Sequence, residues 1–198
     1  MKLYLNQASP YARLVQVVAH EKSLASEIEL VWTDPWASEE KLLAVTPFGK
    51  VPVLVAHDDV PIVESACICD YLDERGPGPR LMSPGGTERL NALRKLGFGR
   101  ALLDVAFGAV IQKRYGGSEE GSILRVRWTH AVARAIDALE CDRTLSLVPD
   151  LGDLAIAVAL AYIDFRMPEV RWSARAPQLA AWHARMTARP SMTATTPT

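Results

Sequence analysis

The sequence predicts a small mixed α/β domain of element order βαβαββα, followed by an all-helical domain. Over about the first 76 residues, short apolar runs alternate with segments of helical period, which indicates strands and helices in turn. Residues 76–86, GPGPRLMSPGG, contain four glycines and three prolines and can form neither a regular helix nor a central strand. Every long segment after them has helical period, so the fold class is α/β plus all-α.

Four strands are expected in the first domain. The helix after the first strand carries Leu14, Val15 and Val18 at helical spacing, and a turn of three polar residues, 57–59, separates the last two strands. The predicted strands are 2–5, 28–32, 53–56 and 61–63, and the predicted helices are 10–22, a short one containing 41–43, and 65–75. This order builds a small mixed sheet flanked by helices.

The second domain is expected to contain four long helices, at about 87–115, 119–141, 150–165 and 176–189. Asp150 can cap the third of them, and Asp153 lies three residues later, where a carboxylate can satisfy free amides of the first turn. We interpret both aspartates as structural and the uncharged run after them as a buried central helix. The expected boundaries are 1–76 for the first domain, 77–86 for the linker and 87–198 for the helical domain.

Composition argues against partners that are bound through net charge. Lys and Arg number 22 against 23 Asp and Glu, so a net charge of -1 gives no reason to expect nucleic acid or an anionic membrane. The sequence contains no run of about 18 apolar residues of the kind that crosses a bilayer. Three cysteines, an odd number, suit a reducing compartment better than a disulfide framework. We therefore expect a cytoplasmic protein.

A serine and a proline, Ser9 and Pro10, stand where the first strand gives way to the first helix. Ser is a favoured N-cap and Pro suits the first helical position, so helix capping explains the pair without any further function. The alternative is a site where a hydroxyl and the positive end of a helix stabilise an anion. The pair by itself leaves both interpretations open.

The stretch TPFGKVPVLV places Pro52 immediately before a predicted strand. Proline cannot donate to a sheet ladder, so it marks a strand start or an edge, and the Val51–Pro52 bond is a candidate for the cis form. In that form Val51 would turn its N–H and C=O outward, where they could pair with a peptide ligand as an added strand does. A plain turn-to-strand proline is the alternative.

Glu64 and Ser65 lie where the fourth predicted strand gives way to a helix. Ser65 is expected to be the N-cap, which needs no function to explain it. A helix start with free amides and a hydroxyl also binds anions, and the Glu64 carboxylate could neutralise an ammonium group. The pair would therefore suit a ligand end that carries both a carboxylate and an ammonium, as a free amino acid does.

Taken together, SPYARLV, FGKVPVLV and VESACICDYLDE, in this order and spacing, resemble the glutathione transferase family. The resemblance continues through the Pro/Gly linker, the helix DLGDLAIAVAL and the closing segment APQLAAWHARMTARPSM, and so covers nearly the whole chain. It implies a thioredoxin-like, glutathione-binding first domain and the glutathione transferase fold, with an all-helical second domain.

The resemblance also implies roles for individual residues. Pro52 would be the cis-proline, Val51 would pair its backbone with the cysteinyl part of glutathione, and Lys50 would be a partner for the glycyl carboxylate. Glu64 and Ser65 would hold the γ-glutamyl end.

In the same way, Ser9 would donate a hydrogen bond to the glutathione sulfur and favour the thiolate, which is the nucleophile. Tyr11, in the same first turn, is the alternative for this role. The stretch SPYA lacks the cysteines of thiol-transferring relatives, which disfavours glutaredoxin-like disulfide exchange.

The function implied is that of a cytoplasmic, homodimeric glutathione transferase, which conjugates the glutathione thiolate to small hydrophobic electrophiles. Glutathione would be the co-substrate, without a metal, a nucleic acid or a membrane. Two alternatives stay open: a non-catalytic transferase-like binding or stress-response protein, and a glutathione-dependent peroxidase or isomerase.

Overall fold

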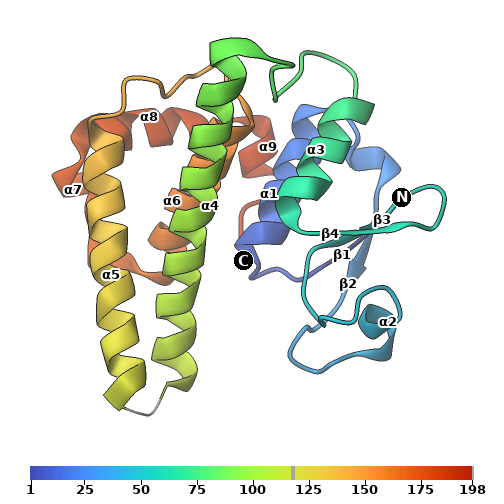
Figure 1. The fold of residues 1–198 in the computed structure, drawn as a ribbon, viewed down its shortest axis with the longest axis horizontal. Coiled ribbons are helices and arrows are strands. Elements are labelled where there is room, and N and C mark those ends of the chain that lie inside the picture. The colour runs from blue at the N-terminus through green and yellow to red at the C-terminus, as the bar shows by residue number, and fades with distance from the viewer. Residues whose placement is uncertain (117–118, 198) are drawn as a thin grey trace. The chain divides into compact units, whose positions relative to one another are not determined.

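Contacts between residues divide the chain into two units: Met1–Met82 together with the residues from Pro190 onward, and Ser83–Arg189. The structure is a computed structural model that describes residues 1–116 and 119–197. Figure 1 labels the helices and strands of both units.

The first unit is built on a four-stranded mixed sheet of order β2-β1-β3-β4. Strand β1 is parallel to β2 and antiparallel to β3, and β3 is antiparallel to β4. The element order βαβαββα predicted from the sequence is confirmed. The strands are β1 Lys2–Leu5, β2 Glu29–Trp32, β3 Val53–Val55 and β4 Pro61–Val63.

Helices α1 and α3 of the first unit pack against each other and bury their apolar faces. On α1, Leu14, Val15 and Val18 have no exposed surface, which is what the helical spacing of these residues predicts. A turn of 3-10 helix, Ala25–Glu27, precedes β2. The helices are α1 Pro10–Glu21, α2 Glu40–Leu43, α3 Ser65–Arg75 and α9 Pro190–Thr193.

The last residues of the chain, which the sequence analysis grouped with the helical domain, pack with the first unit. Helix α9 lies against α1 (Figure 1), and Met192 keeps only 1% of its side chain exposed there. Four residues are too few to produce a hydrophobic periodicity, so the sequence carries no signal for this helix.

The Pro/Gly segment after α3 is held to the first unit by two buried charges. Lys22 and Asp73 form an ion pair with Nζ and Oδ1 3.2 Å apart, and both side chains are buried. Lys22 donates to the carbonyl of Pro79 at 2.9 Å, and Asp73 accepts from the amides of Leu81 and Met82 at 2.8 and 2.9 Å. These bonds fix a segment whose composition excludes regular structure.

The second unit is helical in the residues that the structure describes, as predicted. Helix α6 is its centre: it is buried along almost all of its length, and α4 packs against both α5 and α6. Gly99 of α4 allows the close approach to α6, since a Cβ there would lie 2.8 Å from the backbone of Ala155 and of Ile156. The helices are α4 Gly86–Tyr115, α5 Glu119–Glu140, α6 Leu151–Arg166, α7 Trp172–Arg175 and α8 Pro177–Thr187, with a 3-10 turn at Pro168–Val170.

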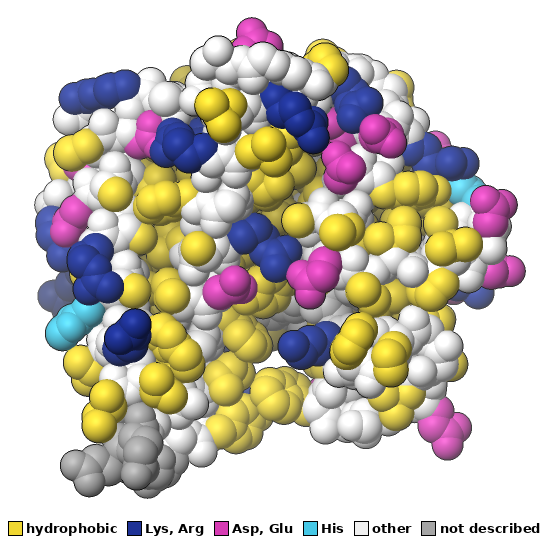
Figure 2. Space-filling view, viewed as in Figure 1, with side chains coloured by type: hydrophobic (Ala, Val, Ile, Leu, Met, Phe, Trp, Pro, Cys, Tyr) yellow, Lys and Arg dark blue, Asp and Glu magenta, His cyan; other side chains and the backbone are white. Residues whose placement is uncertain are grey.

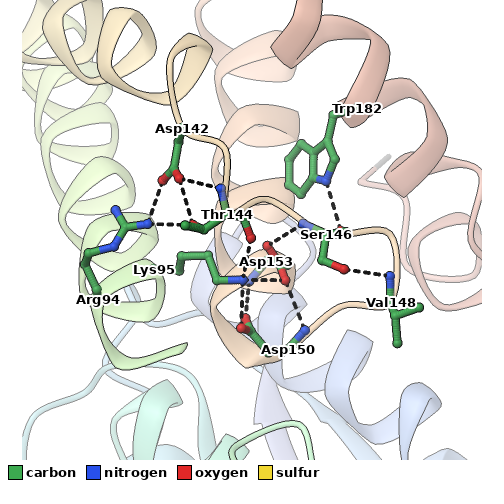
Figure 3. A network of polar contacts seen from close by, with 9 residues as sticks. All are labelled: Arg94, Lys95, Asp142, Thr144, Ser146, Val148, Asp150, Asp153 and Trp182. Carbon is green, nitrogen blue, oxygen red and sulfur yellow. Dashed lines mark hydrogen bonds and ion pairs between the residues drawn. The ribbon is translucent and has the colours of Figure 1, made fainter. Parts of the chain in front are cut away.

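A capping box begins α6 and confirms the structural interpretation of its two aspartates (Figure 3). Asp150 accepts from the Asp153 amide at 2.9 Å, and Asp153 accepts from the Asp150 amide at 3.1 Å. Lys95 of α4 reaches both carboxylates at 2.7 Å. Burial raises the pKa of Asp153 to about 6, against the opposing effect of Lys95.

Charged side chains of both signs are mixed over the face shown in Figure 2. This distribution agrees with the net charge of -1. Among the described residues, no helix combines the length and the apolar character needed to cross a membrane.

Candidate functional site

Ser9 is the N-cap of α1, and its hydroxyl oxygen accepts a hydrogen bond from the Ala12 amide at 3.2 Å. Pro10 occupies the first helical position and is buried, whereas Ser9 is half-buried. A serine hydroxyl has two acceptor lone pairs and one proton to donate, and the cap uses only an acceptor. No acceptor for that proton lies in the described part of the chain, so Ser9 can cap α1 and still donate to a ligand.

Tyr11 lies in the first turn of α1 and is half-buried. It therefore stays close in sequence and structure to Ser9. Its position is compatible with the alternative role for which the sequence analysis considered it.

The Val51–Pro52 peptide bond is cis, which confirms the expectation for this position. Pro52 is buried and Val51 is half-buried, and the sheet ladder begins only at Val53. Within residues 1–116 and 119–197, the amide and carbonyl of Val51 have no hydrogen-bond partner. Val51 therefore offers a donor and an acceptor next to the sheet. Lys50 before it is exposed.

Glu64 and Ser65 differ from the expectation in one respect. The N-cap of α3 is Glu64, without a side-chain capping bond, and Ser65 is the first helical residue, so the prediction of Ser65 as N-cap is wrong. The helix itself has the predicted bounds, 65–75, and the capping position before it is taken by Glu64, with φ of 68° and ψ of 118°. Ser65 is only 1% exposed and Glu64 is exposed.

The conformation of Glu64 is itself a feature of the site. A positive φ is uncommon for a residue with a side chain, and backbone outliers of this kind cost about 1–3 kcal/mol and cluster at functional sites. The strain places an exposed carboxylate at the start of α3.

The register of the sheet brings the three motifs to one edge. Val53 of β3 pairs with Tyr4 of β1 and with Val63 of β4. Because β3 is antiparallel to both neighbours, the residues just before Val53 lie beside those that follow β1 and β4. Val51–Pro52, Glu64–Ser65 and the connection that ends at Ser9 therefore meet at the same edge of the sheet.

A hollow lies at the carboxyl ends of β1 and β2, and it was not predicted from the sequence. Its volume is about 400 Å³. Asn6 is one of the residues that line it, and the Oδ1 atom of Asn6 is buried without a partner in the described residues. Because its lining comes from the end of β2 and from two loops, no periodic pattern marks it; the turn-rich stretch TDPW after β2 is a weak sequence signal. The lining residues are Asn6, Gln7, Trp32, Thr33, Asp34 and Glu39.

Glu39 organises the loop on one side of this hollow. Its carboxylate accepts from Lys41, from the Asp34 amide and from Thr33, and these bonds lower its pKa to about 2. Glu39 is therefore ionised at neutral pH. Among the described residues, no group of three or more His, Cys, Asp or Glu side chains could hold a metal ion.

Comparisons with known proteins cover both units. Residues 8–75 match the N-terminal domain of glutathione S-transferases, and residues 127–185 match the C-terminal domain of the same family. A crystal structure of a glutathione transferase family member from Pseudomonas fluorescens Pf-5, with bound glutathione, is 30% identical to this chain. It superposes with a TM-score of 0.93 over 100% of this chain and 98% of that one.

Two curated relatives extend the comparison. An uncharacterized GST-like protein of Escherichia coli K12, YibF, is 24% identical over 100% of this chain and 98% of its own length. A stringent starvation protein A homolog of Pasteurella multocida is 40% identical over 82 residues, which are 41% of this chain and 37% of that protein. Two family models and a whole-length likeness at 30% identity lead to one conclusion: this chain belongs to the glutathione S-transferase family.

Proposed function

We propose that this protein is a glutathione transferase that binds glutathione, favours its thiolate and directs the sulfur at a small hydrophobic electrophile. The observation that carries the proposal is the sheet register, which brings Val51–Pro52, Glu64–Ser65 and the Ser9 connection to one edge. The bound glutathione of the Pseudomonas fluorescens relative supports the choice of ligand.

Glutathione is a tripeptide, and each part of it has a complementary group at this edge. The amide and carbonyl of Val51 would pair with the cysteinyl backbone as an added strand. The γ-glutamyl end carries an ammonium and a carboxylate, which would meet Glu64 and the Ser65 end of α3. The exposed ammonium of Lys50 would bind the glycyl carboxylate.

Ser9 would then hold the sulfur as a thiolate. A free thiol has a pKa near 8.5, so only a few per cent is ionised at neutral pH. A hydrogen bond to a charged group contributes roughly 1.5–3 kcal/mol, or about one to two pKa units. The hydroxyl donates and does not itself attack, and the α1 end adds a favourable dipole.

The reaction needs no other protein nucleophile. The thiol proton leaves to solvent, the thiolate sulfur forms a bond to the electrophilic carbon, and the leaving group departs with its electron pair. Ser9 would release the sulfur as its negative charge disappears.

Two substitutions of Ser9 test the role of its hydroxyl. Alanine removes both the donor and the cap, at a cost of about 1 kcal/mol to α1, whereas glycine removes the donor but costs the cap only a few tenths. We expect both variants to lower kcat/KM for a chlorinated aromatic electrophile at pH 6.5 by about tenfold or more, as the loss of such a bond predicts. Glutathione affinity, measured by calorimetry, should change little.

Wild-type turnover in Ser9→Gly would remove the hydroxyl from the mechanism. Tyr11→Phe is the corresponding test of the alternative residue. Retention of activity in that variant assigns the sulfur contact to Ser9.

We also propose that the protein acts as a homodimer in the cytoplasm. Large exposed apolar side chains such as Phe48, 67% exposed, and Trp36, 58% exposed, are the kind of surface that subunit contacts cover. Analytical ultracentrifugation at micromolar protein concentrations tests the homodimer. A protein that stays monomeric at these concentrations would refute it.

A second function is favoured by one comparison. The likeness to a stringent starvation protein A homolog is 40% over 82 residues. A non-catalytic stress-response protein of this fold would keep the first unit without useful turnover. Absence of glutathione binding at millimolar concentration would favour it, whereas binding with turnover favours the transferase.

Peroxidase or isomerase action would use the same glutathione site. Assays with a hydroperoxide and with an isomerisable substrate distinguish these two activities from conjugation.

A further inference from the structure

Helix α1 carries a buried cation that the proposed mechanism does not use. Arg13 is only 7% exposed, and its Nη2 atom donates to the backbone carbonyl of Met192 at 3.2 Å. Its Nε atom is buried without a partner among the described residues. Burial lowers the pKa of Arg13 to about 10, so the guanidinium stays charged at neutral pH.

Buried charges are normally paired with a charge of opposite sign, and Arg13 has no such pair among the residues that the structure describes. In the described part of the chain, no carboxylate lies within 4 Å of the guanidinium. Residues 190–197, which we call the C-terminal segment, contain no ionisable side chain. Asp73 of α3 is held by Lys22 and Arg80, and Glu21 of α1 accepts from Ser191. The guanidinium of Arg13 therefore donates to a neutral group, the carbonyl of Met192.

The C-terminal segment lies along α1 and is tied to it twice. Ser191, Met192 and Thr195 of the segment are at least nine-tenths buried. Arg13 bonds to the segment from the end of the first turn of α1, and Glu21 does so from the last turn. The segment thus connects two ends of the helix that begins at the candidate site.

The first of these ties lies on the turn that Ser9 caps. Arg13 follows Ser9 by four residues, its own amide donates to the Ser9 carbonyl at 3.0 Å, and residues four apart share one face of a helix. A shift of Arg13 would therefore move the backbone that orients the Ser9 hydroxyl.

We propose that Arg13 is a positioning residue, which ties the Ser9 end of α1 to the C-terminal segment through the Met192 carbonyl. Met192 lies 179 residues from Arg13 in the sequence, so a distant part of the chain holds the candidate site in position. The catalytic consequence rests on the proposed role of Ser9, whereas the mechanical tie does not.

Hydrogen exchange of the full-length protein tests the tie without reference to activity. In Arg13→Met we expect the amides of Ala12 and of residue 13 to exchange about tenfold faster, as local opening of the first turns predicts. The amide of Leu54 in β3 should be unaffected. Arg75→Met, the same change at an exposed arginine of α3, is the matched control and should leave α1 unchanged.

Unchanged exchange at Ala12 and Arg13 would overturn the proposal, and so would an equal acceleration at Leu54, which indicates a general loss of stability. If the Arg13→Met variant does not fold, the same exchange measurement is made on Arg13→Lys. Lysine keeps the cation but has a different reach and donor geometry, so its exchange should lie between wild type and Arg13→Met.

A double-mutant cycle that combines Arg13→Met with Ser9→Ala tests whether Arg13 affects catalysis through Ser9. From the pH dependence of kcat/KM, we expect Arg13→Met to raise the pKa of bound glutathione by about half to one unit. In the Ser9→Ala background it should add nothing, because Arg13 acts through Ser9. Additive shifts would overturn the positioning role and indicate a direct effect of the charge on sulfur. If Ser9→Ala alone leaves this pKa unchanged, the proposed function of Ser9 fails while hydrogen exchange still decides the tie.

Discussion

Replacing Lys22 by methionine should destabilise the first unit far more than the loss of an ordinary ion pair. Lys22 is 1% exposed and Asp73 is fully buried, with Nζ and Oδ1 3.2 Å apart. Methionine fills much of the space of the lysine stem but leaves the buried carboxylate without its ammonium partner. Breaking a buried pair by removing one member costs about 3–5 kcal/mol.

Other bonds to Asp73 place the expected cost at the lower end of that range. The carboxylate still accepts from the amides of Leu81 and Met82 and from Arg80. We therefore expect a loss of about 3 kcal/mol, which for a chain of this size lowers Tm by roughly 6–12 °C.

The pH dependence gives a second readout with a definite sign. Burial favours the neutral form of Asp73, but its hydrogen bonds outweigh burial and hold its pKa below the ordinary 3.8. A depressed acid pKa contributes stability above the unfolded pKa of about 3.9, and this stability is lost as the pH falls through the folded pKa. In Lys22→Met the folded pKa should rise toward the unfolded value, so this part of the acid-induced loss should shrink.

The assay is thermal unfolding followed by circular dichroism, with Lys113→Met as the matched control. Lys113 and Glu169 form a pair at 3.1 Å, nearly the same distance, but both side chains are more than half exposed. Such a pair contributes about 0–1 kcal/mol. A Tm drop in Lys22→Met no larger than that in Lys113→Met would refute the reasoning that burial decides the cost.

Two further substitutions have predicted outcomes. Gly99→Ala should lower Tm, because its Cβ would meet the α6 backbone at 2.8 Å and overpacking costs about 1–3 kcal/mol, whereas Gly97→Ala on the same helix meets nothing within 4 Å and should raise Tm. Equal shifts of the same sign would contradict the close approach. Glu64→Gly should relieve the positive φ and leave Tm unchanged or higher, while glutathione affinity measured by calorimetry falls about tenfold. A lower Tm would show that the strain argument is wrong.

Local chemistry made much of the fold predictable. The apolar spacing of α1 and the three-residue separation of Asp150 and Asp153 each determine a structure within a few residues, and both predictions are confirmed. Lys95, which joins both aspartates, lies 58 residues from Asp153 in the chain, and no local pattern connects them.

The candidate site was less predictable, because its decisive features depend on tertiary structure. The N-cap of α3 is Glu64 in place of Ser65, and Glu64 adopts a positive φ, which a non-glycine residue does not suggest. The tie between Arg13 and Met192 joins residues at opposite ends of the chain. The motifs could be read from the sequence, whereas the distant residues that hold their backbone in place could not.

The distribution of unmet hydrogen-bonding groups adds an independent reason to place a ligand at this edge. At Lys22 and Asp73, the buried polar atoms each make several bonds. By contrast, the Oδ1 atom of Asn6, the hydroxyl proton of Ser9 and the backbone of Val51 have no partner among the described residues. Asn6 directly follows β1, and Val51 lies just before β3, so the register places them side by side. A peptide with its own donors and acceptors would pair with the Ser9 hydroxyl and with the backbone of Val51. These open donors and acceptors therefore support the proposed peptide ligand on grounds other than the likeness to known proteins.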